Sequence, residues 1–121
     1  MHAGRSKTQM KLTARDAIIP PAKLRDYLLS EGHPDGWSKA RYLARLGYRR
    51  EDWGRLGRDL REQILPLEAC PLGETPWGTK YEILGVLSGP NGQAGWIRSI
   101  WIVLRREKRP RLVTLTPWKE P

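Results

Sequence analysis

The stretch KYEILGVLSGPNGQAGWIRSIWIVL, residues 80–104, carries the clearest signal for local structure in this sequence. Residues 80–87 and 95–104 are rich in β-branched and aromatic side chains, which favour extended strands. Between them lies Gly89-Pro90-Asn91-Gly92, with proline at the first central position of a turn. The stretch therefore predicts two antiparallel strands joined by a tight turn.

The sequence after this hairpin continues the same pattern. A basic connection, residues 105–109, leads into RLVTLTP, residues 111–117, which reads as a third strand. A shorter strand is expected between Leu67 and Thr75. We therefore predict a sheet of three to five mainly antiparallel strands.

The sequence before the hairpin has helical spacing instead. Apolar residues recur three and four positions apart in three segments, 22–32, 37–48 and about 51–65, with Pro21 at the first turn of the first segment and Gly32 at its expected end. Helices followed by strands indicate an α+β fold with the helices packed on one face of the sheet. The length of 121 residues fits one domain, and we place it at 18–121, after a flexible basic tail, 1–17.

Composition excludes several classes of site. A single cysteine, Cys70, cannot form an internal disulfide, and two histidines cannot supply zinc-ligand spacing, so neither a metal nor any other cofactor is expected. No run approaches the roughly 18 apolar residues of a membrane-spanning helix, and no secretory signal is recognisable. We expect a cytoplasmic protein that does not engage membranes.

The charge indicates the kind of partner. Net charge is +9, with 22 lysines and arginines against 13 aspartates and glutamates. Residues 1–50 carry 11 basic and 4 acidic side chains, residues 51–80 carry 4 and 6, and residues 81–121 carry 7 and 3. If the two basic ends meet in the fold, they form one positive face that attracts phosphates, most readily those of RNA. The alternative is that these charges only keep the surface soluble.

The side chains available for chemistry are cations, hydroxyls, one loop histidine and tryptophans. RNA supplies its own nucleophile, the 2′-OH, so its cleavage needs only proton transfer and stabilisation of charge. The catalytic candidates are Lys39, Lys80, Arg98, Arg111 and Thr114. Arg98 stands out because it interrupts an otherwise apolar strand face. Alternatively, Arg98 extends to solvent near the strand end, and Lys80 only protects an edge strand.

A second group of side chains is expected to bind nucleic acid without reacting. It consists of His33, Arg41, Arg45, Arg49 and Trp77. The arginines form the densest cationic stretch of the chain, and an exposed tryptophan can stack on a base. The alternatives are that His33 is an ordinary polar loop residue and that most tryptophans pack in the core or at its rim.

Several motifs, in order, resemble an uncharacterised bacterial family, domain of unknown function family 6883. They are KLRDYLL (23–29), HPDGWSKARYLARLGY (33–48), GTKYEILGVLSGPNG (78–92), IRSIWIV (97–103) and PRLVTLTP (110–117). The layout is similar to the RNase-toxin superfamily of barnase, EndoU, the colicin tRNases and RelE. This resemblance implies a toxin system with an acidic antitoxin or immunity protein, and it points to the same five catalytic candidates.

Our leading hypothesis is a metal-independent endoribonuclease toxin of a toxin–antitoxin or polymorphic-toxin system, with tRNA or ribosome-bound mRNA as targets. Lys39 and Lys80 engage the scissile phosphate, Arg98 and Arg111 stabilise its developing charge, and Thr114 positions an oxygen. The alternative is a non-catalytic RNA- or protein-binding module in a phage or defence system, which the scarcity of histidine favours.

Overall fold

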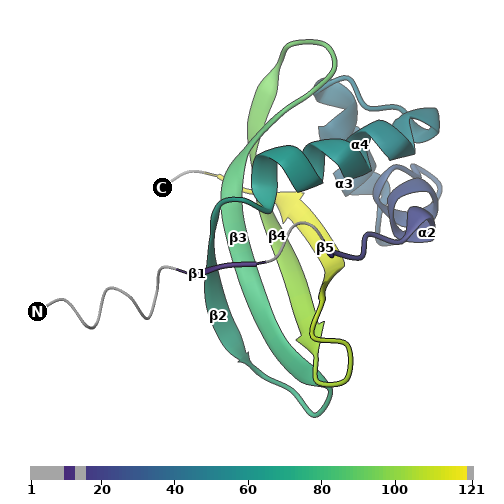
Figure 1. The fold of residues 1–121 in the computed structure, drawn as a ribbon. Coiled ribbons are helices and arrows are strands. Elements are labelled where there is room, and N and C mark those ends of the chain that lie inside the picture. Colours follow the sequence, from purple (N-terminus) through teal and green to yellow (C-terminus); the bar gives the residue numbers. More distant parts are fainter. Residues whose placement is uncertain (1–9, 13–15, 120–121) are drawn as a thin grey trace, which may run out of the picture.

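A computed structural model describes residues 10–12 and 16–119 of the chain. A small helical layer precedes strands β2 to β5 in the sequence, as predicted, whereas the short strand β1 comes before the helices (Figure 1). The helical elements are α2 (Pro21–Lys23), η1 (Leu24–Leu28), α3 (Trp37–Arg45), η2 (Arg50–Asp52), α4 (Trp53–Asp59) and η3 (Leu60–Ile64), and the strands are β1 (Met10–Lys11), β2 (Glu68–Glu74), β3 (Gly78–Ser88), β4 (Ala94–Leu104) and β5 (Pro110–Pro117).

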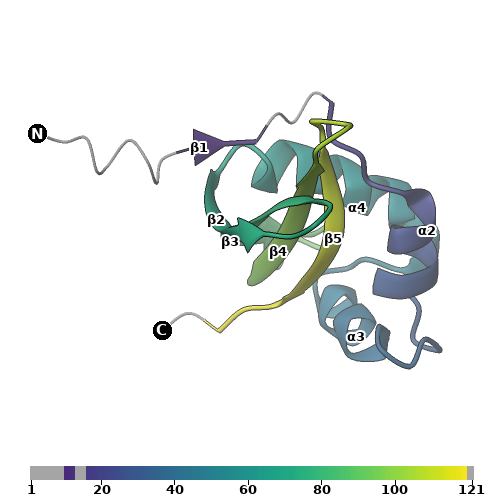
Figure 2. The same ribbon diagram turned by 90° about the horizontal axis from the view of Figure 1, so that it is seen from below.

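The sheet is an antiparallel meander in which the strands lie in sequence order from β1 to β5. The predicted hairpin is β3–β4, paired without interruption from Gly78 opposite Leu104 to Ser88 opposite Ala94. The strand expected between Leu67 and Thr75 is β2. The α+β fold class is thereby confirmed, and the helices lie on one side of the sheet (Figures 1 and 2).

The core forms where the sheet meets the helices. Alternate side chains of the strands point to the helices and are fully buried, including Ile83, Leu87, Ile97, Trp101 and Leu115. The helices contribute Leu28, Leu43, Leu56, Leu60 and Ile64. Burial of one such aliphatic side chain contributes about 1.5–3 kcal/mol. This packing determines which face of the sheet the helices cover. We call the opposite face of the sheet, which the helices leave uncovered, the open face.

The predicted helices agree with the structure at two places and differ at a third. Segment 37–48 contains α3, which ends at Arg45, and Gly47 beyond it has a positive φ of 101° that allows the chain to turn. Segment 51–65 contains α4 and η3. The first helix was predicted to reach Gly32, which is wrong, because it ends at Leu28. The chain then turns back until Gly36 lies against the carbonyl of Tyr27, where an added Cβ would be 2.0 Å from the oxygen.

The predicted tail, residues 1–17, falls mostly outside the described residues. Of its described part, Met10 and Lys11 pair with β2, and Ala17 is buried. The boundary at residue 17 stays a prediction. No helix among residues 10–12 and 16–119 is long and apolar enough to cross a membrane.

One buried polar contact joins the segment after α3 to α4. The Tyr48 hydroxyl donates to Oδ2 of Asp59 over 2.5 Å, and Nε of Arg55 lies 2.9 Å from the same oxygen. Burial and the carboxylate together raise the pKa of Tyr48 well above its usual value. The side chain of Asp59 is 4% exposed, so the phenol and the carboxylate depend on each other for hydrogen bonding.

We therefore expect Asp59→Ala to lower the free energy of unfolding by about 1.5–3 kcal/mol, the contribution of a hydrogen bond to a charged group. The measurement is urea unfolding followed by circular dichroism. Glu51→Ala, at an exposed carboxylate, is the matched control and should unfold at nearly the urea concentration of the parent. Equal stability of the two variants would contradict this account.

Candidate functional site

A chain of hydrogen bonds connects the helical layer to the outer strand of the sheet. Nζ of Lys39, on α3, donates to the hydroxyl of Tyr27, on η1, over 2.8 Å. That hydroxyl lies 3.0 Å from Oγ1 of Thr114, on β5, and either oxygen can donate. With His33 beside Tyr27, these residues form what we call the edge cluster: Tyr27, His33, Lys39 and Thr114.

Local irregularities bring these residues together. The pairing of β5 with β4 shifts by one residue at Val113, since Ile100 faces Thr114 whereas Trp101 faces Leu112. This bulge breaks the strict alternation of the strand next to Thr114. On the other side, the turn that seats Gly36 against Tyr27 also places His33.

The ring of His33 is oriented by its own loop. Nδ1 accepts the backbone N–H groups of Asp35, over 2.9 Å, and Gly36, over 3.1 Å. The ring then meets that of Tyr27 edge-on, with centroids 5.0 Å apart. Because Nδ1 is the acceptor, Nε2 carries the proton of the neutral ring and is the nitrogen available to a ligand.

Two ammonium groups surround the Tyr27 ring. Nζ of Lys39 lies 5.0 Å and Nζ of Lys23 5.5 Å from the ring centroid. Burial alone would raise the pKa of Tyr27, but the hydrogen bonds with Lys39 and Thr114 and the charges of the two lysines outweigh it. The pKa of Tyr27 is therefore lowered, which makes its hydroxyl a stronger proton donor than an ordinary tyrosine.

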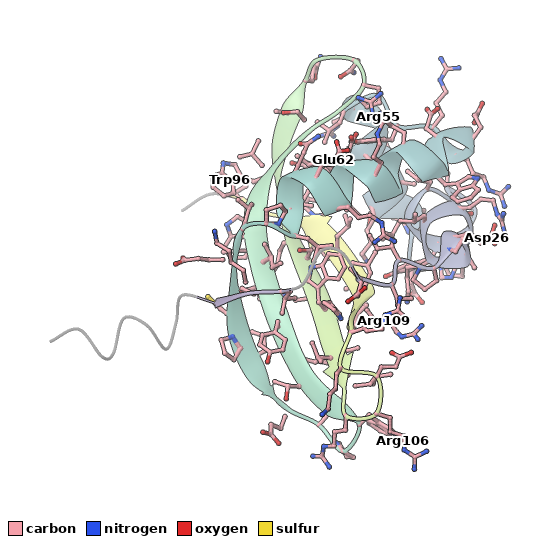
Figure 3. The ribbon with its side chains drawn as sticks, in the orientation of Figure 1. Asp26, Arg55, Glu62, Trp96, Arg106 and Arg109 are labelled. Atoms are coloured by element: carbon pink, nitrogen blue, oxygen red, sulfur yellow. The ribbon has the colours of Figure 1, made fainter. Side chains whose placement is uncertain are left out.

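The edge cluster opens into a pocket of about 700 Å³. The pocket is lined by Pro20, Ala22, Lys23, Asp26, Tyr27, His33, Val113 and Thr114. Its carboxylate, Asp26, labelled in Figure 3, binds Arg25 over 3.0 Å and Arg50 over 2.9 Å. Hydrogen bonds from these two guanidinium groups lower the pKa of Asp26 to about 2, so its charge is neutralised by arginine rather than by a ligand. With Asp26 paired to arginine, the remaining charged side chain of the lining is Lys23.

Arg98 lies on the open face in an ion pair. Its Nε binds Oε2 of Glu82, on the adjacent strand β3, and the two side chains are 35% and 19% exposed. Glu82 lies in one row of the sheet with Ile100 and Thr114, and Arg98 lies in the next row outward, opposite Thr116. Two strand spacings, about 10 Å, separate the backbones of Glu82 and Thr114. The ion pair and the edge cluster are thus neighbours across the sheet.

Lys80 and Arg111 lie farther along the strands. Both are in the row of Ile102, two residues from the row of Ile100. Arg111 binds the carboxylate of Glu107 over 2.6 Å. The structure therefore brings Lys39 and Thr114 together with His33, puts Arg98 nearby, and separates Lys80 and Arg111 from that group.

The residues expected to bind nucleic acid are spread more widely. Arg41 and Arg45 line a second pocket, of about 360 Å³, between α3 and the end of β5, where the Arg41 guanidinium lies 6.0 Å from the exposed Trp37 ring. Arg49 is exposed beyond the end of α3. Trp77 is exposed at the other end of the sheet.

Sequence reasoning missed two residues of this region. Tyr27 was not among the predicted site residues. Its ring packs on the core, but its hydroxyl is the centre of the edge cluster. The position of Glu82 could have been predicted from the sequence. The turn at 89–92 sets the register of the hairpin, and in that register Glu82 lies diagonal to Arg98 on the adjacent strand. Opposite charges at such positions attract each other.

Metal ligands are not grouped in the described part of the chain. Among residues 10–12 and 16–119, no three histidine, cysteine, aspartate or glutamate side chains lie close enough to hold a metal ion.

Residues 11–119 match the model of a family described as a domain of unknown function, DUF6883. The chain belongs to the DUF6883 family. The resemblance drawn from the sequence motifs is thereby confirmed. A comparison of this DUF6883 chain with curated proteins found no match.

The fold is similar to that of one chain in a contact-dependent growth inhibition toxin–immunity protein complex from Klebsiella pneumoniae 342. The TM-score is 0.61 with 15% sequence identity, over 88% of the DUF6883 chain and 97% of that chain. At this identity the likeness shows a shared fold.

The edge cluster predicts an unusual tyrosine titration. In the parent protein Tyr27 should ionise at a lower pH than a free tyrosine, and Lys39→Met should raise its pKa by removing a hydrogen bond and a charge. The measurement is the ultraviolet absorbance of phenolate against pH, with Tyr27→Phe subtracted to isolate Tyr27. Lys80→Met removes the same charge at a site outside the cluster and should leave the Tyr27 pKa nearly unchanged. A Tyr27 pKa that is unchanged in Lys39→Met would rule out the cluster.

Proposed function

We propose that this protein is a metal-independent endoribonuclease that acts as a toxin. The observation that carries the proposal is the Tyr27 hydroxyl, held between Lys39 and Thr114 at the wall of a cationic pocket. A proton donor with a lowered pKa beside positive charge is what cleavage of a phosphodiester by its own 2′-OH requires.

The chemistry is a transesterification. The carboxylate of Glu82, oriented by Arg98, takes the proton of the 2′-OH, and O2′ attacks phosphorus. The P–O2′ bond forms as the P–O5′ bond breaks, and Tyr27 donates its proton to the departing O5′. The products end in a 2′,3′-cyclic phosphate and a 5′-hydroxyl. Glu82 and Tyr27 then exchange protons with solvent and return to their starting states.

The other residues of the proposed site bind the RNA and stabilise the charge that develops during cleavage. Lys39 and Arg98 lie on either side of the reacting phosphate and offset the negative charge that develops on its oxygens. The hydroxyl of Thr114 and Nε2 of His33 donate hydrogen bonds to oxygen atoms of the RNA. Lys80 and Arg111, two residues farther along the strands, bind phosphates of flanking nucleotides. Arg41, Arg45 and Arg49 attract RNA toward α3.

The role as a toxin is supported by the fold, which is shared with a chain from a toxin–immunity complex. Targets such as tRNA and ribosome-bound mRNA place its action in the cytoplasm. An endoribonuclease of this kind requires a neutralising protein in the cell that makes it. The net charge of +9 indicates an acidic immunity protein or antitoxin that covers the cationic pockets.

A second function is favoured by the open face. Leu72, Leu84 and Val86 are exposed there, and the guanidinium groups of Arg98 and Arg111 bind carboxylates of the chain itself. These features also fit a non-catalytic RNA- or protein-binding module. Such a module would bind RNA with a steep dependence on salt and leave it intact.

Loss of either proton-transfer group should abolish most of the cleavage. We expect Tyr27→Phe and Glu82→Gln each to lower kcat on single-stranded RNA by about 10²- to 10⁴-fold, the usual contribution of one general acid or base. Cleavage by the parent should persist in EDTA. Growth arrest on expression should be relieved by the same variants, and by Lys39→Ala.

Arg58→Ala is the matched control for these variants, because Arg58 is exposed on α4. It removes a charge without touching the site and should remain fully toxic. RNA left uncut by the purified parent, or a Tyr27→Phe variant as active as the parent, would overturn the catalytic assignment.

The pH profile of kcat/KM gives a further check. Tyr27 must be protonated to donate, so activity should fall at high pH as Tyr27 ionises. Because Lys39 lowers the pKa of Tyr27, Lys39→Met should move this alkaline limb to higher pH while it lowers the maximal rate. An alkaline limb that stays in place in Lys39→Met would show that another group controls it.

A further inference from the structure

Trp77 is the most exposed of the large hydrophobic side chains in the described part of the chain, at 70%. It lies between β2 and β3, at the end of the sheet opposite the β3–β4 turn. Neither the fold nor the proposed active site uses this side chain. Tryptophan is one of the residue types enriched at binding interfaces.

The backbone around Trp77 is held rigidly. Oγ1 of Thr75 accepts the N–H groups of Trp77, over 3.2 Å, and Gly78, over 3.1 Å. The Trp77 carbonyl accepts the N–H of Arg105 over 3.0 Å. An added Cβ on Gly78 would lie 2.2 Å from the carbonyl oxygen of Val103, so the turn is seated directly on β4. The indole is therefore presented by a fixed support, which lowers the entropic cost of binding a flat ligand.

Arginines lie next to the indole. Trp77 lines a pocket of about 520 Å³ together with Pro76, Leu104, Arg105 and Arg106. Arg105 is 3.7 Å from Glu74, but both side chains are largely exposed, so the pair is weak. In the described part of the chain, Arg106 has no ion pair or side-chain hydrogen bond, and it extends from the end of the sheet in Figure 3. The pocket has an apolar floor and a cationic rim.

This pocket is connected to the proposed active site by the sheet itself. Leu104 is four residues along β4 from Ile100, about 13 Å at the rise of a strand. The row that contains Lys80 and Arg111 lies between the two. An extended anionic chain that crosses the open face therefore meets the ammonium group of Lys80 between the two sites.

We propose that Trp77, Arg105 and Arg106 form a subsite for one unpaired base of single-stranded RNA and the phosphate next to it, a few nucleotides from the bond that is cut. The base stacks on the indole and the arginines bind the phosphate. This inference rests on the proposed function for the identity of the ligand. An acidic protein is the competing occupant, and RNA is favoured because a single flat ring with a cationic rim matches a nucleotide.

Fluorescence anisotropy with a labelled 2′-O-methyl oligoribonucleotide of mixed sequence tests the subsite. The probe has no free 2′-OH, so it binds without being cut. Trp77→Ala should weaken its binding about 5- to 150-fold, equivalent to the 1–3 kcal/mol of one base–aromatic stack. Trp77→Phe should retain most of the affinity. Arg106→Ala should reduce the slope of log affinity against log salt by about 0.7, the value for one phosphate contact on a single strand.

The control is Leu67→Ala, which removes another exposed apolar side chain, on the helix side of the sheet, and should leave the affinity unchanged. An affinity unaffected by Trp77→Ala would overturn the subsite, as would equal losses in Trp77→Ala and Leu67→Ala or the absence of oligonucleotide binding by the parent. Cleavage is measured separately on unmodified RNA. A parent protein that binds the oligonucleotide through Trp77 but does not cut RNA would refute the endoribonuclease and support the subsite. A parent protein that cuts RNA independently of Trp77 would support the endoribonuclease and refute the subsite.

Discussion

The hydrogen bonds from Lys39 to Tyr27 and from Tyr27 to Thr114 connect three elements that are far apart in the sequence. Each element is held by its own packing: η1 and α3 by the leucines of the core, and β5 by its pairing with β4. The Tyr27 ring shares in that packing, so its hydroxyl is fixed where the helical layer meets the outer strand. The position of a proton donor, and the lowered pKa of that donor, thus follow from the way the core is assembled.

The structure shows how the positive charge of the chain is distributed over its surface. Several arginines bind carboxylates of the chain: Arg55 binds Asp59, Arg98 binds Glu82 and Arg111 binds Glu107. Other cations lie around pockets: Lys23 and Lys39 near the Tyr27 ring, Arg41 and Arg45 between α3 and β5, and Arg105 and Arg106 at the end of the sheet. The net positive charge is therefore distributed over discrete sites rather than over one uniform face.

Strands could be predicted well from the sequence because alternation and turn chemistry act locally. The hairpin 80–104 needs only its β-branched residues and the Gly89–Gly92 turn. The end of the first helix could not be predicted, since it depends on Gly36 approaching the Tyr27 carbonyl. Thr114 and Lys39 were selected for their chemistry, yet their meeting depends on the bulge at Val113 and on Tyr27, and neither has a local signature. Glu82 could have been predicted, because the register of the hairpin places it beside Arg98.

The central claim is that residues of this chain alone activate the 2′-OH of RNA. Mass spectrometry of the products from a DNA oligonucleotide with one internal ribonucleotide tests it most directly. The account predicts a single cut, on the 3′ side of the ribonucleotide, with a 2′,3′-cyclic phosphate on one fragment and a 5′-hydroxyl on the other, in the presence of EDTA. An uncut oligonucleotide, or fragments with 3′-hydroxyl and 5′-phosphate ends, would contradict it.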